Sequence, residues 1–147
     1  MTTATTTIGA LGHAPAVSSP HRTLFVVAAL WNFGGAAMGL LFFDPLAAIA
    51  WTTPGPLHDP VAKQFAMMVF ALVGVLGIGY VIVSIDPTRN RGLVLTAAIG
   101  KAAVLAVGAY YSWGVATAWL LVPAIGITFF TLAFSWFLVT TRDQGWY

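Results

Sequence analysis

The third long apolar run of the sequence reads LVLTAAIGKAAVLAVGAYYSW, from Leu93 to Trp113. A run of this length is enough for an α-helix to cross the hydrocarbon core of a bilayer, which takes about 20 residues. It contains one charged side chain, Lys101, close to its centre. A charge at that depth costs about 2.5–3.5 kcal/mol on insertion scales and usually has a partner or a role. We therefore expect the specific role of the protein to involve Lys101.

The composition of the whole chain is that of a membrane protein. Of its 147 residues, 59% are hydrophobic and only 7% are charged, whereas soluble domains carry about 25% charged residues. Such a chain cannot cover a globule with polar side chains, and its length allows one domain. The net charge of +2 is too small to indicate a nucleic-acid partner, and the absence of cysteine excludes disulfides and thiolate metal sites.

Four apolar runs are long enough to span the bilayer, and Lys101 is the one charged residue within them. Uninterrupted runs of this kind favour helices over the short alternating strands of a β-barrel. Residues 1–20 are predicted to form a flexible tail, residues 21–141 a single transmembrane domain, and residues 142–147 a short second tail. The predicted spans are residues 23–43, 65–85, 93–113 and 119–139.

The connections between these runs indicate how the helices are arranged. Residues 44–64 contain four prolines, which favours an irregular loop in which residues 46–51 lie in the membrane interface. The next two connections are short, and short connections place consecutive helices antiparallel. The sequence therefore predicts an all-α fold, a transmembrane four-helix up-down bundle.

The basic residues outside the spans predict the orientation, because cytoplasmic loops carry more Lys and Arg. Lys63 falls on one side of the predicted bundle. The arginines fall on the other: Arg22, Arg89, Arg91 and Arg142. Both termini and the turn of residues 86–92 are therefore predicted to be cytoplasmic. Within this turn we expect Asp86, Arg89 and Arg91 to form a polar helix connector held by ion pairs, with docking of lipid phosphate or another protein as the alternative.

Three polar side chains are predicted to lie within the bundle, two of them near its middle. Counting 1.5 Å per helical residue, Lys101 lies about 15 Å beyond Arg91, and Asn32 lies at the same depth on the first helix. Tyr80 lies somewhat nearer the cytoplasm on the second helix. Small residues flank Asn32 and Lys101, so we expect both to face the bundle interior. Since no Asp or Glu lies within a span, Lys101 is either neutral, bonded to Asn32, Tyr80 or backbone carbonyls, or paired with an acid from a ligand or another subunit.

Several short stretches resemble those of a group of bacterial four-helix integral membrane proteins. They are Trp31-Asn32, Gly77-Ile78-Gly79-Tyr80, the turn Asp86-Pro87-Thr88-Arg89-Asn90-Arg91, and Gly100-Lys101. The resemblance covers residues 25–138, and in size and topology the chain is also loosely similar to DoxX-like proteins. It implies a bacterial inner-membrane location and brings no activity, cofactor or partner with it.

These observations favour a non-enzymatic accessory or lipophilic-ligand-binding membrane protein. No nucleophile–base pair, phosphate-binding loop or metal motif indicates catalysis, and His58 next to Asp59 lacks a third metal ligand. In this interpretation Lys101, with Asn32 and Tyr80, holds an acidic or carbonyl group of a lipophilic ligand or of a partner membrane protein. The alternatives are an oligomeric small transporter or channel-like protein, and an auxiliary subunit in quinone-linked electron transfer.

Overall fold

The computed structural model describes residues 19–144, so most of the predicted N-terminal tail and the last three residues lie outside the described residues. Four helices in this range are long and apolar enough to cross a membrane, which confirms the predicted all-α organisation with four spans. The elements are α1 (Ser19–Leu41), α2 (Phe43–Ala50), η1 (Gly55–His58), α3 (Pro60–Ile85), α4 (Arg91–Ser112), η2 (Ala118–Leu120), α5 (Leu121–Thr140) and η3 (Arg142–Gln144), where η denotes a 3₁₀ turn.

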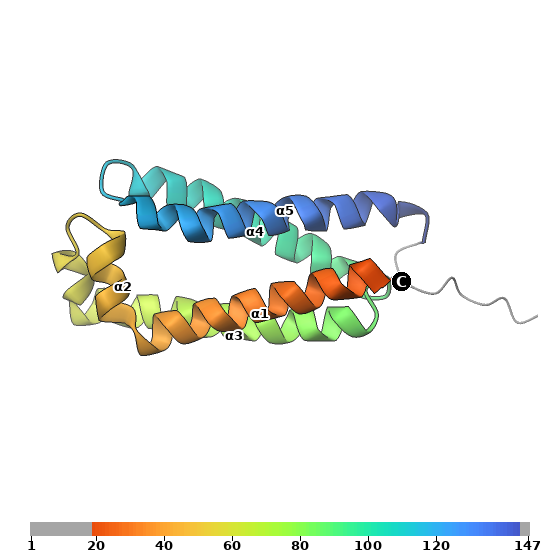
Figure 1. Cartoon of the computed structure of the whole chain (residues 1–147), viewed down its shortest axis with the longest axis horizontal. Coiled ribbons are helices and arrows are strands. Elements are labelled where there is room, and N and C mark those ends of the chain that lie inside the picture. The colour runs from red at the N-terminus through yellow and green to blue at the C-terminus, as the bar shows by residue number, and fades with distance from the viewer. Residues whose placement is uncertain (1–18, 145–147) are drawn as a thin grey trace, which may run out of the picture.

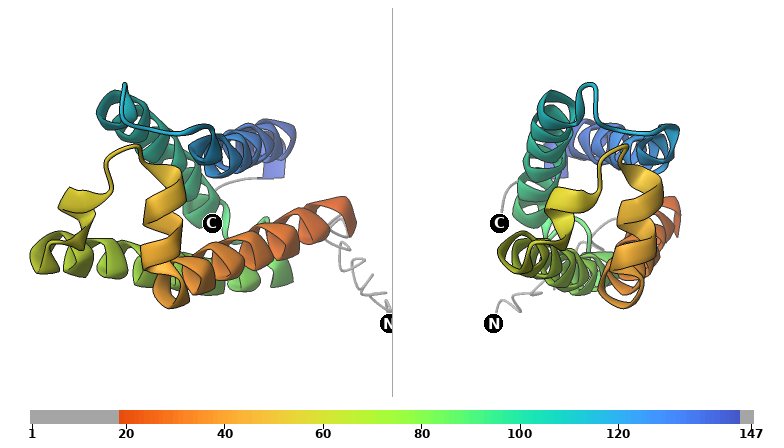
Figure 2. Two further views of the ribbon diagram at one scale, coloured as in Figure 1. Left: turned by 60° about the vertical axis from the view of Figure 1, so that its left-hand side comes forward. Right: turned by 90° about the vertical axis from the view of Figure 1, so that its left-hand side faces the viewer.

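The four long helices form two antiparallel pairs (Figure 1). Helix α1 packs along α3 and helix α4 packs along α5, whereas the two pairs make few contacts with each other. Viewed along the bundle, the four helices occupy the corners of a square, and α2 stands across one end (Figure 2). The interior of the bundle therefore lies between two pairs that are held together mainly near their ends.

The α1–α3 pair is close-packed because small residues on α3 lie under side chains of α1. A Cβ atom added to Gly77 would lie 2.7 Å from Cε1 of Phe33, so the Phe33 ring fills the space a side chain would need. At Gly74 the same added atom would be in van der Waals contact with Ala36, at 3.4 Å. Without a hydrophobic driving force in lipid, such close backbone approach is what holds membrane helices together.

At one end of the bundle, an aromatic core joins the two pairs. Phe25 of α1 stacks on Phe134 of α5 with ring centroids 5.3 Å apart, and it meets Phe137 edge-on at 5.2 Å. All three rings are fully buried. Tyr80 of α3 meets Phe134 edge-on at 5.2 Å, so both helix pairs contribute to this core. Aromatic pairs in these geometries contribute about 0.5–1.5 kcal/mol beyond the area they bury.

Arg91, at the start of α4, links this helix to the end of α5. Its side chain is only 2% exposed, and its guanidinium donates hydrogen bonds to the carbonyl oxygens of Leu138, at 3.0 Å, and Thr141. The last carbonyls of a helix have no donor within the helix, and a cation at this end is favoured by the helix dipole. Arg91 thus closes the C-terminal end of α5.

The turn before α4 is stabilised by Asp86, which follows the last residue of α3. Its carboxylate accepts hydrogen bonds from the backbone N–H of Arg89, at 3.1 Å, and from the hydroxyl of Thr88, at 3.0 Å. These bonds, the Arg89 amide first, hold the pKa of Asp86 below its usual value. Asp86 therefore organises the local turn, while Arg91 extends away from it to α5.

At the other end, the predicted irregular loop of residues 44–64 is wrong in part, because it contains helix α2. Pro45 lies in the first turn of α2, where a missing N–H is tolerated. Helix α3 also begins earlier than predicted, at Pro60. The carboxylate of Asp59 accepts from the backbone N–H groups of the next turn, at 2.9 and 3.2 Å, which is the usual way an aspartate starts a helix.

The end of α2 is tied to the α4–α5 connection by an isolated antiparallel bridge between Trp51 and Ala116. The N–H of Thr52 donates to the carbonyl of Val115 at 2.9 Å, and the N–H of Thr117 donates to the carbonyl of Ala50 at 2.9 Å. This bridge and the aromatic core hold the two helix pairs together at opposite ends. The middle of the bundle is left open.

Candidate functional site

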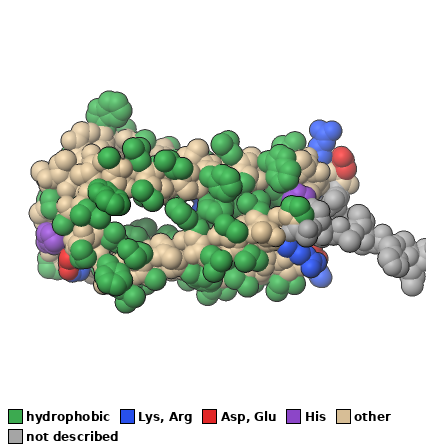
Figure 3. All heavy atoms as spheres, in the orientation of Figure 1, with side chains coloured by type: hydrophobic (Ala, Val, Ile, Leu, Met, Phe, Trp, Pro, Cys, Tyr) green, Lys and Arg blue, Asp and Glu red, His purple; other side chains and the backbone are tan. Residues whose placement is uncertain are grey.

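A cavity of about 490 Å³ lies between the two helix pairs. In the space-filling view the opening between the pairs is visible as a hole through the molecule (Figure 3). Helices α3 and α4 supply most of the lining, α1 supplies Trp31, Asn32 and Gly35, and α5 supplies Pro123 and Ile127. The volume lies within the range of about 300–1,000 Å³ that is usual for small-molecule sites.

All three binding residues predicted from the sequence line this cavity: Asn32, Tyr80 and Lys101. Lys101 lies halfway along α4, and its Nζ atom is 5.4 Å from the centroid of the Tyr80 ring and 5.6 Å from that of Phe130. Both distances are within the range of cation–π attraction. Among residues 19–144, no side chain or carbonyl forms a hydrogen bond or ion pair with Lys101.

No acidic side chain of the chain is placed to neutralise Lys101. The sequence has four aspartates and no glutamate, and all four lie outside the cavity lining. Each has a different partner or position: Asp44 beside Lys63, Asp59 at the start of α3, Asp86 in the α3–α4 turn, and Asp143 beside Arg142. A negative charge for Lys101 must therefore come from something other than an Asp or Glu side chain of this protein.

Tyr80 brings a second polar group to the site. The residue is 3% exposed, and within the described part of the chain its hydroxyl has no hydrogen-bond partner. Leaving a buried hydroxyl unpaired costs about 1–3 kcal/mol, so such groups are uncommon and call for an explanation. Tyr80 lines the cavity, while its hydroxyl oxygen is itself buried, so an acceptor bound in the cavity would meet this hydroxyl only after the side chain turns toward it.

Asn32 has a partner already. It is 4% exposed, and its side-chain N–H donates to the backbone carbonyl of Val73 on α3 at 3.3 Å. The structure therefore gives Asn32 a role in joining α1 to α3 at the wall of the cavity. The Tyr80 hydroxyl has no such partner within residues 19–144, and the contacts of Lys101 there are with the rings of Tyr80 and Phe130.

Phe130 was not singled out from the sequence, although its ring lies beside the Lys101 ammonium. Depth counting on the last span would have found it, because this position lies level with Lys101 when the helices run antiparallel. The sequence does not indicate the rotation of α5 about its axis that turns Phe130 toward Lys101. The turn residues Asp86, Arg89 and Arg91 do not line the cavity.

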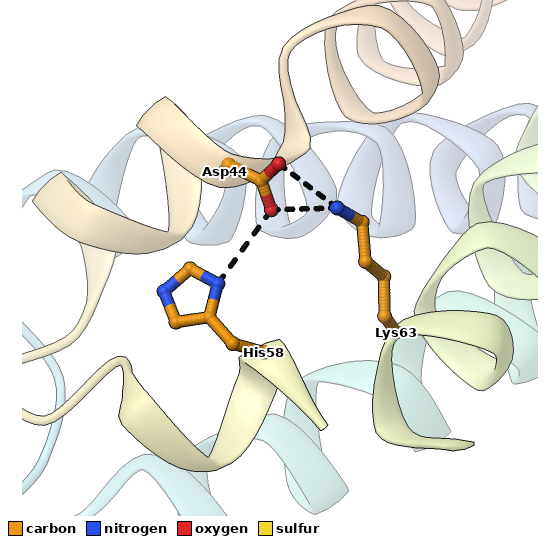
Figure 4. Close-up of polar contacts among 3 residues, drawn as sticks. All are labelled: Asp44, His58 and Lys63. Carbon is orange, nitrogen blue, oxygen red and sulfur yellow. Dashed lines mark hydrogen bonds and ion pairs between the residues drawn. The ribbon is translucent and has the colours of Figure 1, made fainter. Parts of the chain in front are cut away.

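A separate polar cluster lies at the end of the bundle where α2 stands (Figure 4). Nζ of Lys63 lies 2.8 Å from both carboxylate oxygens of Asp44, and Nδ1 of His58 lies 3.6 Å from one of them. The hydrogen bonds from Lys63 lower the pKa of Asp44. No three metal-binding side chains come together within residues 19–144, and Asp59 is used to start α3. This cluster ties α2 to the beginning of α3.

Known proteins offer no guide to the role of this site. The sequence matches no family model, and comparisons with curated proteins and with solved structures find no significant similarity. The resemblance to bacterial four-helix proteins therefore assigns no family to this chain. Its four long apolar helices are those of a small multi-spanning membrane protein in contact with a lipid bilayer.

Proposed function

We propose that this protein binds a lipophilic ligand inside the membrane, in the cavity between the two helix pairs, through Lys101 and Tyr80. The observation that carries the proposal is the position of Lys101. Its ammonium group lies among aromatic rings at the middle of a span, and every acidic side chain of the chain is elsewhere. Ionisable residues at such depths face cavities or partners and mark functional sites.

The chemistry of the lining selects the class of ligand. Apart from Lys101, Tyr80, Asn32 and Thr96, the lining residues are apolar side chains or glycines. A path for ions or polar solutes would need a polar wall, so the lining supports a lipophilic ligand over the transporter alternative. The ligand's polar group is an acid or a carbonyl, because both accept hydrogen bonds from an ammonium group and a phenol hydroxyl.

A binding or accessory role follows from what the site offers. It supplies the Lys101 amine and a set of aromatic and aliphatic side chains, which is the usual make-up of a site that holds and orients a ligand. The α1–α3 pair forms one wall and the α4–α5 pair the other. The ligand would then add contacts between two halves of the protein that otherwise touch mainly at their ends.

Native mass spectrometry of the protein released from mild detergent tests this proposal. We expect wild-type protein to carry a lipophilic adduct after incubation with a bacterial lipid extract, and Lys101→Met to lose at least tenfold in adduct occupancy. Lys63→Met is the matched control, because it removes the other lysine of the chain, which lies outside the cavity lining. Equal occupancy in wild type and Lys101→Met, or a wild type without adduct, would refute the proposal.

We also propose that both termini and the turn of residues 86–92 face the cytoplasm, in a bacterial inner membrane. The support is the distribution of basic residues, since the arginines gather at one end of the four spans. The chain has no cysteine, so single-cysteine variants can be labelled without background. An impermeant thiol reagent added to intact cells should leave Thr88→Cys unlabelled and label Thr53→Cys. The reverse pattern would overturn the orientation.

A further inference from the structure

We infer that the ligand is a single-chain amphiphile with one carboxylate, and that it enters from the hydrocarbon core of the bilayer through the gap between α3 and α4. This inference rests on the proposed function and specifies its ligand and its route. It draws on three observations: the separation of α3 from α4, the open space in front of two glycines, and the single positive charge in the cavity.

Helices α3 and α4 follow each other in the chain and yet separate along most of their length. They make few contacts, and α4 diverges from α3 beyond the turn that joins them (Figure 1). Together they supply most of the cavity lining. Both are candidate membrane spans, so the gap between them faces the acyl chains of the bilayer. A molecule dissolved in the membrane can enter there without passing through water.

Two glycines border this gap, each next in sequence to a polar residue of the cavity. Gly79 of α3 and Gly100 of α4, the neighbour of Lys101, both line the cavity, and a Cβ atom added at either position meets no atom within 4 Å. On the opposite side α1 and α5 likewise make few contacts, and there the indole of Trp31 on α1 lies against Gly126 on α5. We take the α3–α4 side as the entrance because these two helices supply most of the cavity lining.

The charge in the cavity specifies the head group. Lys101 is the one cation among the lining residues, so a ligand with one negative charge is neutralised there, whereas a dianion would keep an unpaired buried charge. A carboxylate accepts hydrogen bonds from the Lys101 ammonium through either oxygen, and the ring of Tyr80 lies beside this position. The aliphatic lining residues of α3 and α4 provide the surface for an acyl tail.

The depth of Lys101 excludes an ordinary phospholipid as the occupant. The residue lies ten positions beyond Arg91, or about 15 Å along the helix. A phospholipid phosphate stays ionised and at the membrane surface, whereas a single-chain carboxylic acid can pass the hydrocarbon core in its neutral, protonated form.

The test measures oleate binding to the full chain in lipid nanodiscs, by native mass spectrometry with ¹³C-labelled oleate. Methyl oleate, which has the same tail and no charge, is the comparison probe. We expect at least a tenfold preference for oleate in wild-type protein and no preference in Lys101→Met. Lysine-dependent binding of a neutral quinone in place of oleate would overturn the carboxylate inference and leave the proposed function standing. If no lipophilic molecule binds in a way that depends on Lys101, both the carboxylate inference and the proposed function are wrong.

The route is tested with leucine substitutions that fill the gap. We expect the double variant Gly79→Leu/Gly100→Leu to lower oleate occupancy at least tenfold, and each single variant to slow oleate uptake. Gly108→Leu is the matched control, since this glycine of α4 also faces open space and does not line the cavity. Thermal unfolding of each variant shows whether it is folded, and the single variants provide the test if the double variant is not. Unchanged uptake in folded gap variants would overturn the route.

Discussion

The two sides of helix α3 use small residues in opposite ways. On the side facing α1, Gly77 is covered by the ring of Phe33, and the two helices pack closely. On the side facing α4, Gly79 borders open space and the helices separate. The two glycines are two positions apart, which on a helix places them on different faces. Small residues in a membrane helix can therefore mark either a packed interface or an entrance, and the neighbouring helix decides which.

Helix α4 shows the same contrast in its two basic residues. The guanidinium of Arg91 donates to carbonyls at the end of α5, so its charge serves the fold. The ammonium of Lys101 contacts aromatic rings and, among residues 19–144, no polar group. Arg91 stabilises the contact between α4 and α5, whereas Lys101 is available to bind a ligand. The same substitution should therefore have different effects at Gly77 and Gly79, and likewise at Arg91 and Lys101.

The largest expected effect is that of Arg91→Met on stability. Loss of two charge-assisted hydrogen bonds to the end of α5 should lower the free energy of unfolding by about 3 kcal/mol. Denaturant unfolding in micelles, followed by circular dichroism, measures this value. Arg89→Met is the control, because Arg89 is exposed and its removal should change stability by less than about 0.5 kcal/mol. Equal stability of the two variants would show that the Arg91 contact is not structural.

The next effect compares the two glycines of α3. Gly77→Leu places a side chain where the Phe33 ring lies, and overpacking of this kind costs about 1–3 kcal/mol. Gly79→Leu fills open space and should change the unfolding free energy by less than about 0.5 kcal/mol. The same micelle assay applies to both. A larger loss for Gly79→Leu than for Gly77→Leu would contradict the assignment of the two faces.

Lys101→Met should have a smaller effect on stability, although it abolishes binding. The cation–π contacts of Lys101 contribute about 0.5–2 kcal/mol, and these are offset by the cost of placing a charge inside a span. In delipidated protein we expect an unfolding free energy within about 1 kcal/mol of wild type. Added oleate should then stabilise wild type and leave the variant unchanged. A loss of about 3 kcal/mol without ligand would instead make Lys101 a structural residue.

The smallest effect concerns the cluster that ties α2 to α3. Lys63 lowers the pKa of Asp44 below its ordinary 3.8, so the folded state holds this proton less tightly than the unfolded state. The stabilisation is present above pH 3.8 and is lost as the pH falls through the lower folded-state pKa. Hydrogen exchange of α2 amides, corrected for the intrinsic pH dependence, should therefore be faster at pH 3 than at pH 6.

Two variants isolate the carboxylate in that experiment. His58 also faces Asp44, so the measurement is made in a His58→Gln background to remove its titration. Asp44→Asn in the same background should abolish the difference between the two pH values. A difference that persists without the carboxylate would assign the pH dependence to another group.

Much of this fold could be predicted from the sequence because membrane spans are long uninterrupted apolar runs. Depth counting also placed Asn32 and Lys101 at one level, and both line the same cavity as Tyr80. The four prolines of residues 44–64 predict an irregular loop and so miss helix α2, whose Pro45 lies in the first turn, where proline is compatible with a helix. The position of the proline within the segment, more than the number of prolines, determines whether a helix forms there.

The parts that could not be predicted depend on how the helices rotate about their axes. Nothing in the sequence distinguishes Gly77, which is covered, from Gly79, which borders the cavity. The direction of the Arg91 side chain toward α5 likewise depends on a contact between positions 47 and 50 residues apart. All four spans are apolar around most of their circumference, so hydrophobic periodicity does not fix which face turns inward.

The most direct test of the account is the distance between the ligand carboxyl carbon and the Lys101 Nζ atom. The chain contains two lysines, so ¹⁵Nζ-lysine labelling gives two signals, and Lys63→Met identifies them. Solid-state NMR in bilayers with carboxyl-¹³C oleate should show strong dipolar coupling to Lys101, as expected for an ion pair within about 4 Å. Coupling to neither lysine in oleate-loaded protein would contradict a ligand site built on Lys101.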